Sequence, residues 1–271
     1  MLKESFLRLG IEYFSVLDYK YARETAEHIR LRSGVLPRSV IVYLLPYYGG
    51  ECQNISRYSA SLDYHIAASE IGEAVICDLR HSFPDMKGAA FGDHSPIDER
   101  HAALVSGLGV LGDNGLIINE KYGSYVFIGD IITDISPELL GAREPVAPAR
   151  CEGCGACKAA CPTGILRGEG DACLSAITQK KGELSEAERA LMIKCGTAWG
   201  CDICQEVCPH NGSPKITPVE FFKYDRIDRL TKECLSEMTE AELRKRAFGW
   251  RGRGVLERNL EVLSEEGGKK Q

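Results

Sequence analysis

The first half of the chain contains both continuous apolar runs and stretches in which apolar residues recur three and four positions apart. A continuous apolar run indicates a strand that is buried on both faces, whereas the wider spacing indicates an amphipathic helix. The pattern predicts helices over residues 21–32 and 61–71, buried strands over 39–45 and 74–79, and a hairpin with arms 115–119 and 124–135. Pro46 is expected to end the first strand, because proline donates no hydrogen bond to a sheet.

Two proline-containing breaks, at residues 144–150 and 214–218, divide the rest of the chain. A helical pattern follows the second break as far as about residue 263, and we expect the polar tail, 267–271, to be disordered. These breaks predict three parts: an α/β domain over 1–143, a second domain over 144–213, and a C-terminal helical segment over 214–271 that packs on the core.

Composition is that of an ordinary globular protein, because 44% of the 271 residues are apolar and 27% are charged. No apolar run approaches the roughly 18 residues of a membrane-spanning helix, so we expect no membrane association. The first residues lack the apolar core and cleavage site of a secretion signal, which predicts a reducing, cytoplasmic setting. A formal net charge of −6 argues against indiscriminate binding of nucleic acid.

Basic residues are nonetheless concentrated near the end of the chain. They are Arg244, Lys245, Arg246, Arg251, Arg253 and Arg258, with Glu257 the only acidic residue in the same window. Such a segment is either a solvated helix face or a patch that contacts phosphates. Trp250, in the same segment, either packs in a core or stacks on RNA.

Cysteine spacing is the strongest chemical signal in the sequence. A first run, C-x2-C-x2-C-x3-C-P, comprises Cys151, Cys154, Cys157 and Cys161 and has the spacing of bacterial two-cluster ferredoxins. In that pattern three thiolates bind one [4Fe–4S] cluster and the fourth binds a second cluster. A second run comprises Cys201, Cys204 and Cys208, followed by proline, and has Ala198 where the pattern has its first cysteine. The spacing therefore predicts two clusters and a protein that transfers electrons.

One cluster ligand must come from outside the two runs. Cys173 is the best candidate because residues 174–178 after it have a helical pattern, and Cys195 is the only plausible competitor. Crossing the two runs assigns one cluster to Cys151, Cys154, Cys157 and Cys208, and the other to Cys161, Cys173, Cys201 and Cys204. The prolines after Cys161 and Cys208 are expected to keep both cysteines out of the right-handed helical region.

Zinc and disulfide bonds are the competing uses of these cysteines. Zinc also binds C-x2-C pairs, but three cysteines at successive three-residue gaps followed by Cys-Pro fit an iron–sulfur cubane better. A chain of this length needs no disulfide bonds to build a core. The scattered cysteines are expected to be small buried apolar residues: Cys52, Cys77, Cys195 and Cys234.

With these residues in place, the chain resembles the epoxyqueuosine reductase family, the cobalamin-dependent iron–sulfur enzymes of queuosine synthesis in tRNA. The resemblance rests on short motifs spread over residues 35–260. Besides the eight cysteines, they are S-R-Y at 56–58, D-Y-H at 63–65, D-H-S-P-I-D-E-R at 93–100, G-L-G at 107–109, G-x-N at 112–114, Y-G-S at 122–124, G-D-I-I-T at 129–133, G-C-D at 200–202 and G-V-L-E-R-N at 254–259. The family has threonine at the position of His94, tryptophan at Val110 and lysine at Asp113.

The resemblance implies an oxidoreductase with two [4Fe–4S] clusters and bound cobalamin, built on an α/β (α+β) corrinoid-binding module with a ferredoxin-like domain. It implies epoxyqueuosine in the anticodon loop of tRNA as substrate and a ferredoxin or flavodoxin as electron donor, and we expect a monomer. By position, Asp93 would donate a proton beside the corrin. The residues that would help to hold the cobalamin are Arg57, Asp93, Ile117, Ile128, Ser175 and Asp202.

Other interpretations remain open at the level of sequence. The chain could reduce another small substrate in the manner of reductive dehalogenases, carry electrons with a degenerate cofactor domain, or bind RNA with structural clusters. Asp93 alone is more typical of a turn or helix cap before Pro96, and its place in the motif D-x-x-P-x-x-E-R is what favours catalysis. His65, His94 and His101 are candidate axial ligands or proton relays, although His65 also fits a packed or exposed helix position.

Overall fold

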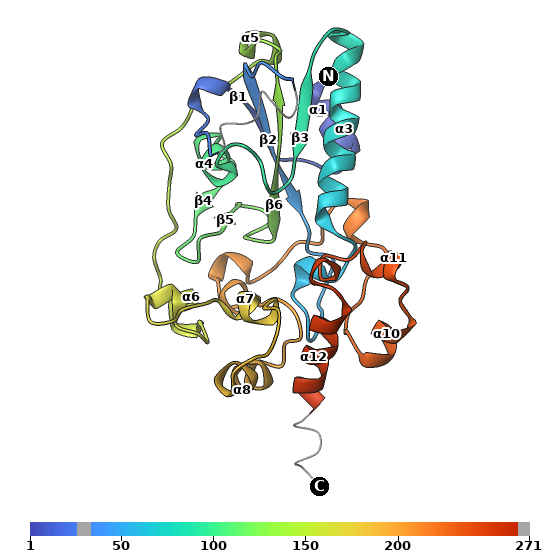
Figure 1. Cartoon of the computed structure of the whole chain (residues 1–271). Coiled ribbons are helices and arrows are strands. Elements are labelled where there is room, and N and C mark those ends of the chain that lie inside the picture. Colours follow the sequence, from blue (N-terminus) through green and yellow to red (C-terminus); the bar gives the residue numbers. More distant parts are fainter. Residues whose placement is uncertain (26–33, 265–271) are drawn as a thin grey trace. The chain divides into compact units, whose positions relative to one another are not determined.

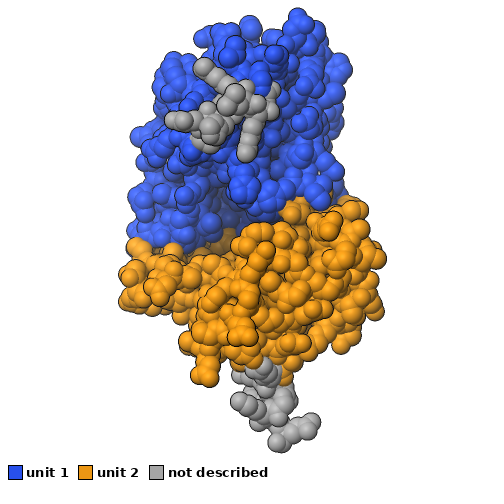
Figure 2. Space-filling model, viewed as in Figure 1, with its two compact units in different colours: residues 1–47, 64–153, 213–220 blue, residues 48–63, 154–212, 221–271 orange. Residues whose placement is uncertain are grey.

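The computed structural model describes residues 1–25 and 34–264 (Figure 1). The chain forms two compact units, each built from segments that are distant in sequence (Figure 2). Unit 1 comprises residues 1–47, 64–153 and 213–220, and unit 2 comprises residues 48–63, 154–212 and 221–271. Within the described ranges, no helix is long and apolar enough to cross a membrane.

Unit 1 contains a four-stranded antiparallel sheet in the order β1–β2–β6–β3 and a two-stranded ribbon of β4 and β5. The strands are β1 (Phe14–Asp18), β2 (Ser39–Pro46), β3 (Gly88–Phe91), β4 (Val110–Leu111), β5 (Ile117–Ile118) and β6 (Val126–Thr133). The helices are α1 (Leu2–Arg8), the 3-10 turn η1 (Tyr19–Tyr21), α3 (Tyr64–Ser82), α4 (Glu99–Val105) and α5 (Pro137–Leu140). The expected mixture of helices and strands is confirmed, in its α+β form.

Both faces of the sheet are covered, which explains the continuous apolar run that predicts β2. Val40, Val42 and Leu44 are fully buried in one apolar cluster with residues of α4. Tyr43 points to the other face, where its hydroxyl donates a hydrogen bond to the Ala68 carbonyl of α3 (3.2 Å). Figure 1 shows α3 and α4 on opposite sides of the sheet. A strand sandwiched in this way has no polar face, so its sequence does not alternate.

The strand predicted over 74–79 is wrong, because these residues form the second half of α3. The helix buries Ile71, Val75, Ile76 and Leu79, which are three and four positions apart. A short apolar run satisfies both patterns, and the length of the whole segment decides for the helix. Gly72 allows this helix to lie close to the sheet, since a Cβ there would lie 2.3 Å from the Cβ of Ala90.

The hairpin predicted over 115–135 has the right turn and the wrong partner strands. Asn119 and Gly123 exchange backbone hydrogen bonds of 2.8 and 2.9 Å, and Gly123 has a φ of 57°. The two arms then diverge, because β5 pairs with β4 whereas β6 enters the main sheet between β2 and β3. The turn is a local property of its residues, but the choice of partner strand depends on the rest of the fold.

Two further predictions concern residues that are only partly described. The helix predicted over 21–32 is wrong for residues 22–25, which follow the 3-10 turn η1 in irregular structure, and residues 26–33 lie outside the described residues. The tail at 267–271 also lies outside them.

Residues 144–149 form the irregular segment that their prolines predict, and Ala149 accepts a backbone hydrogen bond from Leu111 of β4 (2.9 Å).

Unit 2 is built from short helices. They are η2 (Arg57–Ser59), α6 (Ala156–Ala160), η3 (Ile165–Arg167), α7 (Leu174–Thr178), α8 (Glu186–Cys195), α9 (Ile203–Glu206), η4 (Pro209–Asn211), α10 (Lys232–Glu237), α11 (Glu240–Leu243), η6 (Gly249–Arg251) and α12 (Arg253–Ser264). A further 3-10 turn, η5 (Glu220–Phe222), lies before α10, where the chain passes from unit 1 to unit 2. The helical pattern predicted after residue 218 is therefore present, divided into short pieces. Asn259 of α12, fully buried, donates hydrogen bonds to the carbonyls of Thr178 and Ala198 (2.7 Å each) and so ties this helix to the cysteine loops.

Candidate functional site

Six of the seven cysteines of the two runs lie in unit 2, in or beside its short helices, and Cys151 lies at the end of the 64–153 segment of unit 1. Helix α6 carries Cys157, has Cys161 as its C-cap residue, and contacts α9, which carries Cys204. The ψ angles of Cys161 and Cys208 are 114° and 125°, so the extended geometry predicted from the following prolines is confirmed. Cys173 is the N-cap residue of α7, the helix expected at 174–178.

The surroundings of these thiols fit iron–sulfur ligands. Burial raises the pKa of Cys201 to about 12, and the neighbouring thiolates of Cys173 and Cys204 add to the rise, so these three sulfurs lie together. Burial acts to raise the pKa of Cys161 too, but hydrogen-bond donors outweigh it and lower the pKa overall. These donors are the backbone N–H groups of residues 163, 164 and 166 and the Thr163 hydroxyl. Hydrogen bonds of this kind tune cluster potentials.

The other cysteines differ from expectation in one case. Cys77 is exposed on α3, so its predicted burial is wrong, because it lies on the face of the helix that points away from the sheet. Cys52, Cys195 and Cys234 are half-buried. Cys195, the competitor of Cys173, packs against an apolar cluster that includes Met192.

Asp93 lies in unit 1 where the chain leaves the main sheet. Strand β3 ends at Phe91, and Asp93 and His94 then adopt φ angles of 65° and 58°. Two consecutive left-handed residues other than glycine cost on the order of 1–3 kcal/mol each, and they persist only where the surrounding structure holds them. Aspartate and histidine are among the residue types that tolerate this region best.

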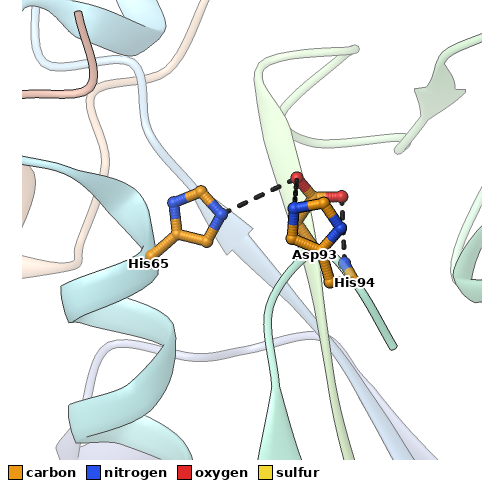
Figure 3. A group of neighbouring side chains, drawn as sticks. All are labelled: His65, Asp93 and His94. Atoms are coloured by element: carbon orange, nitrogen blue, oxygen red, sulfur yellow. Dashed lines mark hydrogen bonds and ion pairs between the residues drawn. The ribbon is translucent and has the colours of Figure 1, made fainter. Parts of the chain in front are cut away.

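Four side chains, which we call the Asp93 cluster, meet at this bend: Asp93, His94, Tyr64 and His65. The Tyr64 hydroxyl donates a hydrogen bond to Asp93 Oδ2 (3.2 Å). Nε2 of His65 lies 3.6 Å from the same oxygen, and Nε2 of His94 lies 3.8 Å from it (Figure 3). The Tyr64 ring also stacks on Phe127 of β6, with ring centres 4.0 Å apart. Helix α3 therefore places two polar rings beside Asp93, while the stacking fixes them to the sheet.

One fully buried and one half-buried carboxyl group support the bend. Burial and the charge of Asp93 raise the pKa of Glu99 to about 7, while this side chain accepts backbone hydrogen bonds from Ser95 and Asp93. Asp130 is fully buried, and burial together with the charge of Glu99 raises its pKa well above the usual range. The Ser95 hydroxyl donates to Asp130 Oδ1 (3.1 Å). Sequence reasoning gave these two residues no role, although both stand within the quoted motifs.

Backbone groups at Ile117 and Ile128 are directed away from their partner strands. The N–H of Leu44 donates to the carbonyl of Tyr13, the residue before β1, on the side away from β6. The facing residue in β6, Ile128, therefore turns its N–H and C=O away from β2. Strand β3 pairs only with residues 130–133 of β6 and does not reach this position. Similarly, Leu111 bonds to residues 149 and 151, which leaves the backbone of Ile117 pointing away from β4. Within the described residues neither group has a backbone partner on that side, and a polar ligand could supply one.

Arg57 and Asp202 lie together in unit 2. The Arg57 side chain is 10% exposed and forms ion pairs with Asp202 (3.3 Å), Glu206 (2.6 Å) and Glu51. The backbone N–H of Arg57 also donates to Asp202 (2.7 Å), so the network joins the segment 48–63 to the loop that follows Cys201. The third residue assigned to this unit, Ser175, lines a surface pocket of about 640 Å³ with Cys173, Lys181 and Arg251.

Most of the basic C-terminal segment is engaged within unit 2. Arg246 pairs with Asp225 (2.7 Å), Arg253 with Glu240 (2.8 Å), and Arg258 donates to the Lys180 carbonyl (2.7 Å). The guanidinium of Arg251 lies over the exposed ring of Trp250, 3.7 Å from its centre. These contacts favour a structural role for most of the segment. In unit 1, Asp113 pairs with Arg150 (3.3 Å).

A family model described as a 4Fe-4S double cluster binding domain matches residues 150–211, which contain all eight predicted ligands. The expectation of a two-cluster iron–sulfur domain is thus confirmed. An epoxyqueuosine reductase of Synechocystis sp. is 32% identical over 219 residues, which cover 76% of this chain and 74% of that protein. The chain belongs to the epoxyqueuosine reductase family. A second family member, from Listeria monocytogenes, is 31% identical over 84% of this chain and 64% of its own length.

Solved structures of epoxyqueuosine reductases share the fold. The enzyme from Streptococcus thermophilus aligns with 99% of this chain and 81% of its own, with a TM-score of 0.75 and 22% identity. An epoxyqueuosine reductase crystallised with an epoxyqueuosine-modified tRNA stem loop aligns with 97% and 80%, with a TM-score of 0.77 and 23% identity. Because the chain belongs to the epoxyqueuosine reductase family, it is an oxidoreductase. Family membership therefore favours a reductase over a protein that only carries electrons.

Proposed function

We propose that this chain reduces epoxyqueuosine to queuosine in tRNA with the help of cobalamin and two [4Fe–4S] clusters, and that a ferredoxin or flavodoxin supplies the electrons. Family membership and the double-cluster region support the reaction class. The observation that carries the residue assignment is the Asp93 carboxylate, which the Tyr64 hydroxyl and the His65 imidazole face at a strained bend. The cluster ligands remain as assigned from the sequence, with Cys173 as the eighth.

Reduction of an epoxide to an alkene consumes two electrons and two protons and releases water. Bound cobalamin would supply the reducing centre at its cobalt, fed with single electrons by the clusters. Asp93 would donate a proton to the epoxide oxygen as its carbon–oxygen bond breaks. The side chain is 49% exposed, so a substrate can reach it within unit 1.

The other residues of unit 1 position Asp93 and offer contacts to a cofactor. Glu99 and Asp130 act as positioning residues for the loop. Glu99 accepts hydrogen bonds from its backbone, and Asp130 accepts one from the Ser95 hydroxyl. The outward backbone groups of Ile117 and Ile128 would exchange hydrogen bonds with the carboxamide side chains that surround a corrin ring. Arg57, Ser175 and Asp202 of unit 2 remain proposed cofactor contacts.

The test compares Asp93→Asn with the exposed carboxylate variant Asp85→Asn, which makes the same change of charge in the turn before β3. Each protein is prepared anaerobically with clusters and cobalamin, and queuosine formed in tRNA carrying epoxyqueuosine is measured by mass spectrometry. We expect Asp93→Asn to lower turnover about 10²–10⁴-fold, with iron content and the corrin spectrum unchanged. Asp85→Asn should behave as the unmodified chain.

Each part of the proposal can fail separately. Undiminished turnover by Asp93→Asn would refute the proton-donor role. A protein with intact clusters and no corrin absorption after reconstitution would refute the cofactor. Reduction of a free small substrate with no turnover of tRNA would replace the substrate while keeping the reaction class.

A further inference from the structure

Two imidazoles and a carboxylate converge within the Asp93 cluster. His65 comes from the first turn of α3, and Asp93 and His94 come from the bend after β3, so that the three side chains face one another (Figure 3). One potential ligand atom of each residue lies within 4.8 Å of those of the other two. All three side chains are accessible, with exposed fractions of 44%, 49% and 88% for His65, Asp93 and His94.

We propose that His65, Asp93 and His94 form a binding site for a divalent first-row cation such as Zn²⁺, and that the bound ion blocks proton donation by Asp93. The first part stands on the geometry alone. The second rests on the proposed function, because coordination would occupy the carboxylate that the reaction uses as a proton donor.

The observed distances need only small changes to match a zinc site. Zinc bonds of about 2.0–2.2 Å in a tetrahedron place neighbouring ligand atoms about 3.3 Å apart. Asp93 Oδ2 already lies 3.6 Å from Nε2 of His65 and 3.8 Å from Nε2 of His94. The remaining edge, between the two histidines, is at most 4.8 Å, and the largely exposed His94 side chain can move to adjust it.

The ligand set and its surroundings also suit zinc. Two histidines and one carboxylate with a fourth position open to solvent form a known type of zinc site. The carboxylate is oriented from outside the site, since Tyr64 donates to Oδ2 and the backbone N–H of His94 donates to Oδ1 (3.1 Å). Partners of this kind fix metal ligands in place. The strained backbone of residues 93 and 94 keeps both side chains on the same side of the bend.

His94 supplies the discriminating variant. Threonine is β-branched and therefore strained at the φ of 58° that His94 adopts, so His94→Thr is first checked for an unchanged iron content and unfolding midpoint. His94→Asn, which tolerates this backbone region, is measured beside it. His81 offers a matched control, because it is an exposed histidine on the same helix as His65. The exposed thiol of Cys77 lies one turn from His81 and could bind zinc with it. All proteins compared therefore carry Cys77→Ser.

Cluster-loaded protein without cobalamin is dialysed anaerobically against a series of Zn²⁺ concentrations, and bound zinc is measured. We expect one zinc equivalent whose affinity falls at least about 10-fold in His94→Thr, His65→Gln and Asp93→Asn, and stays the same in His81→Asn. Zinc that binds to the remaining free thiols is the same in every variant, so it does not affect the comparison between variants. Identical binding curves for the parent protein and His94→Thr would overturn the site.

The inhibitory role is measured separately in the tRNA assay. Zn²⁺ should inhibit the parent protein at concentrations that fill the site, a chelator should restore turnover, and His94→Thr should need at least about 10-fold more zinc for the same inhibition. Equal sensitivity of the two proteins would overturn the inhibitory role. Absence of turnover in both would refute the proposed function, whereas the dialysis result would still decide the metal site.

Discussion

The cysteine loops of unit 2 and the Asp93 cluster of unit 1 are assembled in opposite ways. All eight predicted cluster ligands lie on one segment, 151–208, and their spacing alone indicates the group that they bind. The Asp93 cluster takes its residues from a helix and from a bend after a strand, supported by a second helix and a second strand. Metal chemistry that depends on local spacing is therefore visible in a sequence, and acid chemistry that depends on burial is not.

The two regions also differ in the surroundings of their buried carboxyl groups. In unit 2 the buried Asp202 has Arg57 as an ion-pair partner, and two more exposed glutamates complete the network. In unit 1 the fully buried Asp130 has the charge of the half-buried Glu99 nearby, and Glu99 has that of Asp93, so like charge adds to burial in raising both pKa values. In unit 2 the buried carboxyl group joins segments of chain through an ion pair, whereas in unit 1 burial beside another carboxylate favours the protonated form.

The largest effect is expected in the cysteine loops, where Cys173→Ser is compared with Cys195→Ser. If spacing and proximity identify the eighth ligand, Cys173→Ser loses one cluster, so that bound iron falls from about eight to about four atoms per chain. Cys195→Ser should keep its iron, since this residue packs against apolar side chains. Iron analysis and anaerobic absorption spectra decide between them. Loss of iron from Cys195→Ser alone would reverse the assignment.

The next effect concerns the ion-pair network of unit 2. Arg57→Met keeps an apolar stem but leaves Asp202 buried without its cation, which should lower the free energy of unfolding by about 3–5 kcal/mol. Burial already raises the pKa of Asp202, so the loss should shrink at lower pH as this group becomes neutral. Urea unfolding of the cluster-loaded protein measures it, with Arg244→Met, at an exposed position, as the control. Equal stability of the two variants would show that the network does not hold the segment.

The smallest effect tests the unpaired carboxyl groups of unit 1 through Glu99→Gln. Because the folded pKa of Glu99 is about 7 against an ordinary 4.5, folding binds a proton, and its contribution to stability is lost as the pH rises from 4.5 to 7. Glutamine removes this dependence, so the variant should exceed the parent in stability above pH 7 by on the order of 2–3 kcal/mol, allowing for partial exposure. Urea unfolding across this pH range checks the sign. The exposed Glu73→Gln should leave the curve unchanged, and a parent curve that is already flat would contradict the burial argument.

Particular residues show where prediction from sequence succeeded and failed. Strand β2, the helix after Cys173 and the extended geometry of Cys161 and Cys208 follow from local patterns, and all were found. Residues 74–79 and the arms of the 115–135 hairpin were misassigned, because short apolar runs do not reveal which partner they pack against. Glu99 and Asp130 were overlooked because their importance comes from burial, which no single motif encodes.

The sequence alone determined that this protein carries two iron–sulfur clusters and which family it resembles, since cluster ligands require fixed spacings along a contiguous segment. Only the tertiary structure decided what surrounds Asp93. The bend after β3, the rings presented by α3 and the carboxyl groups of α4 and β6 come together through packing. Packing also sets the exposure and charge of each group, and these quantities govern where a proton or a metal ion binds.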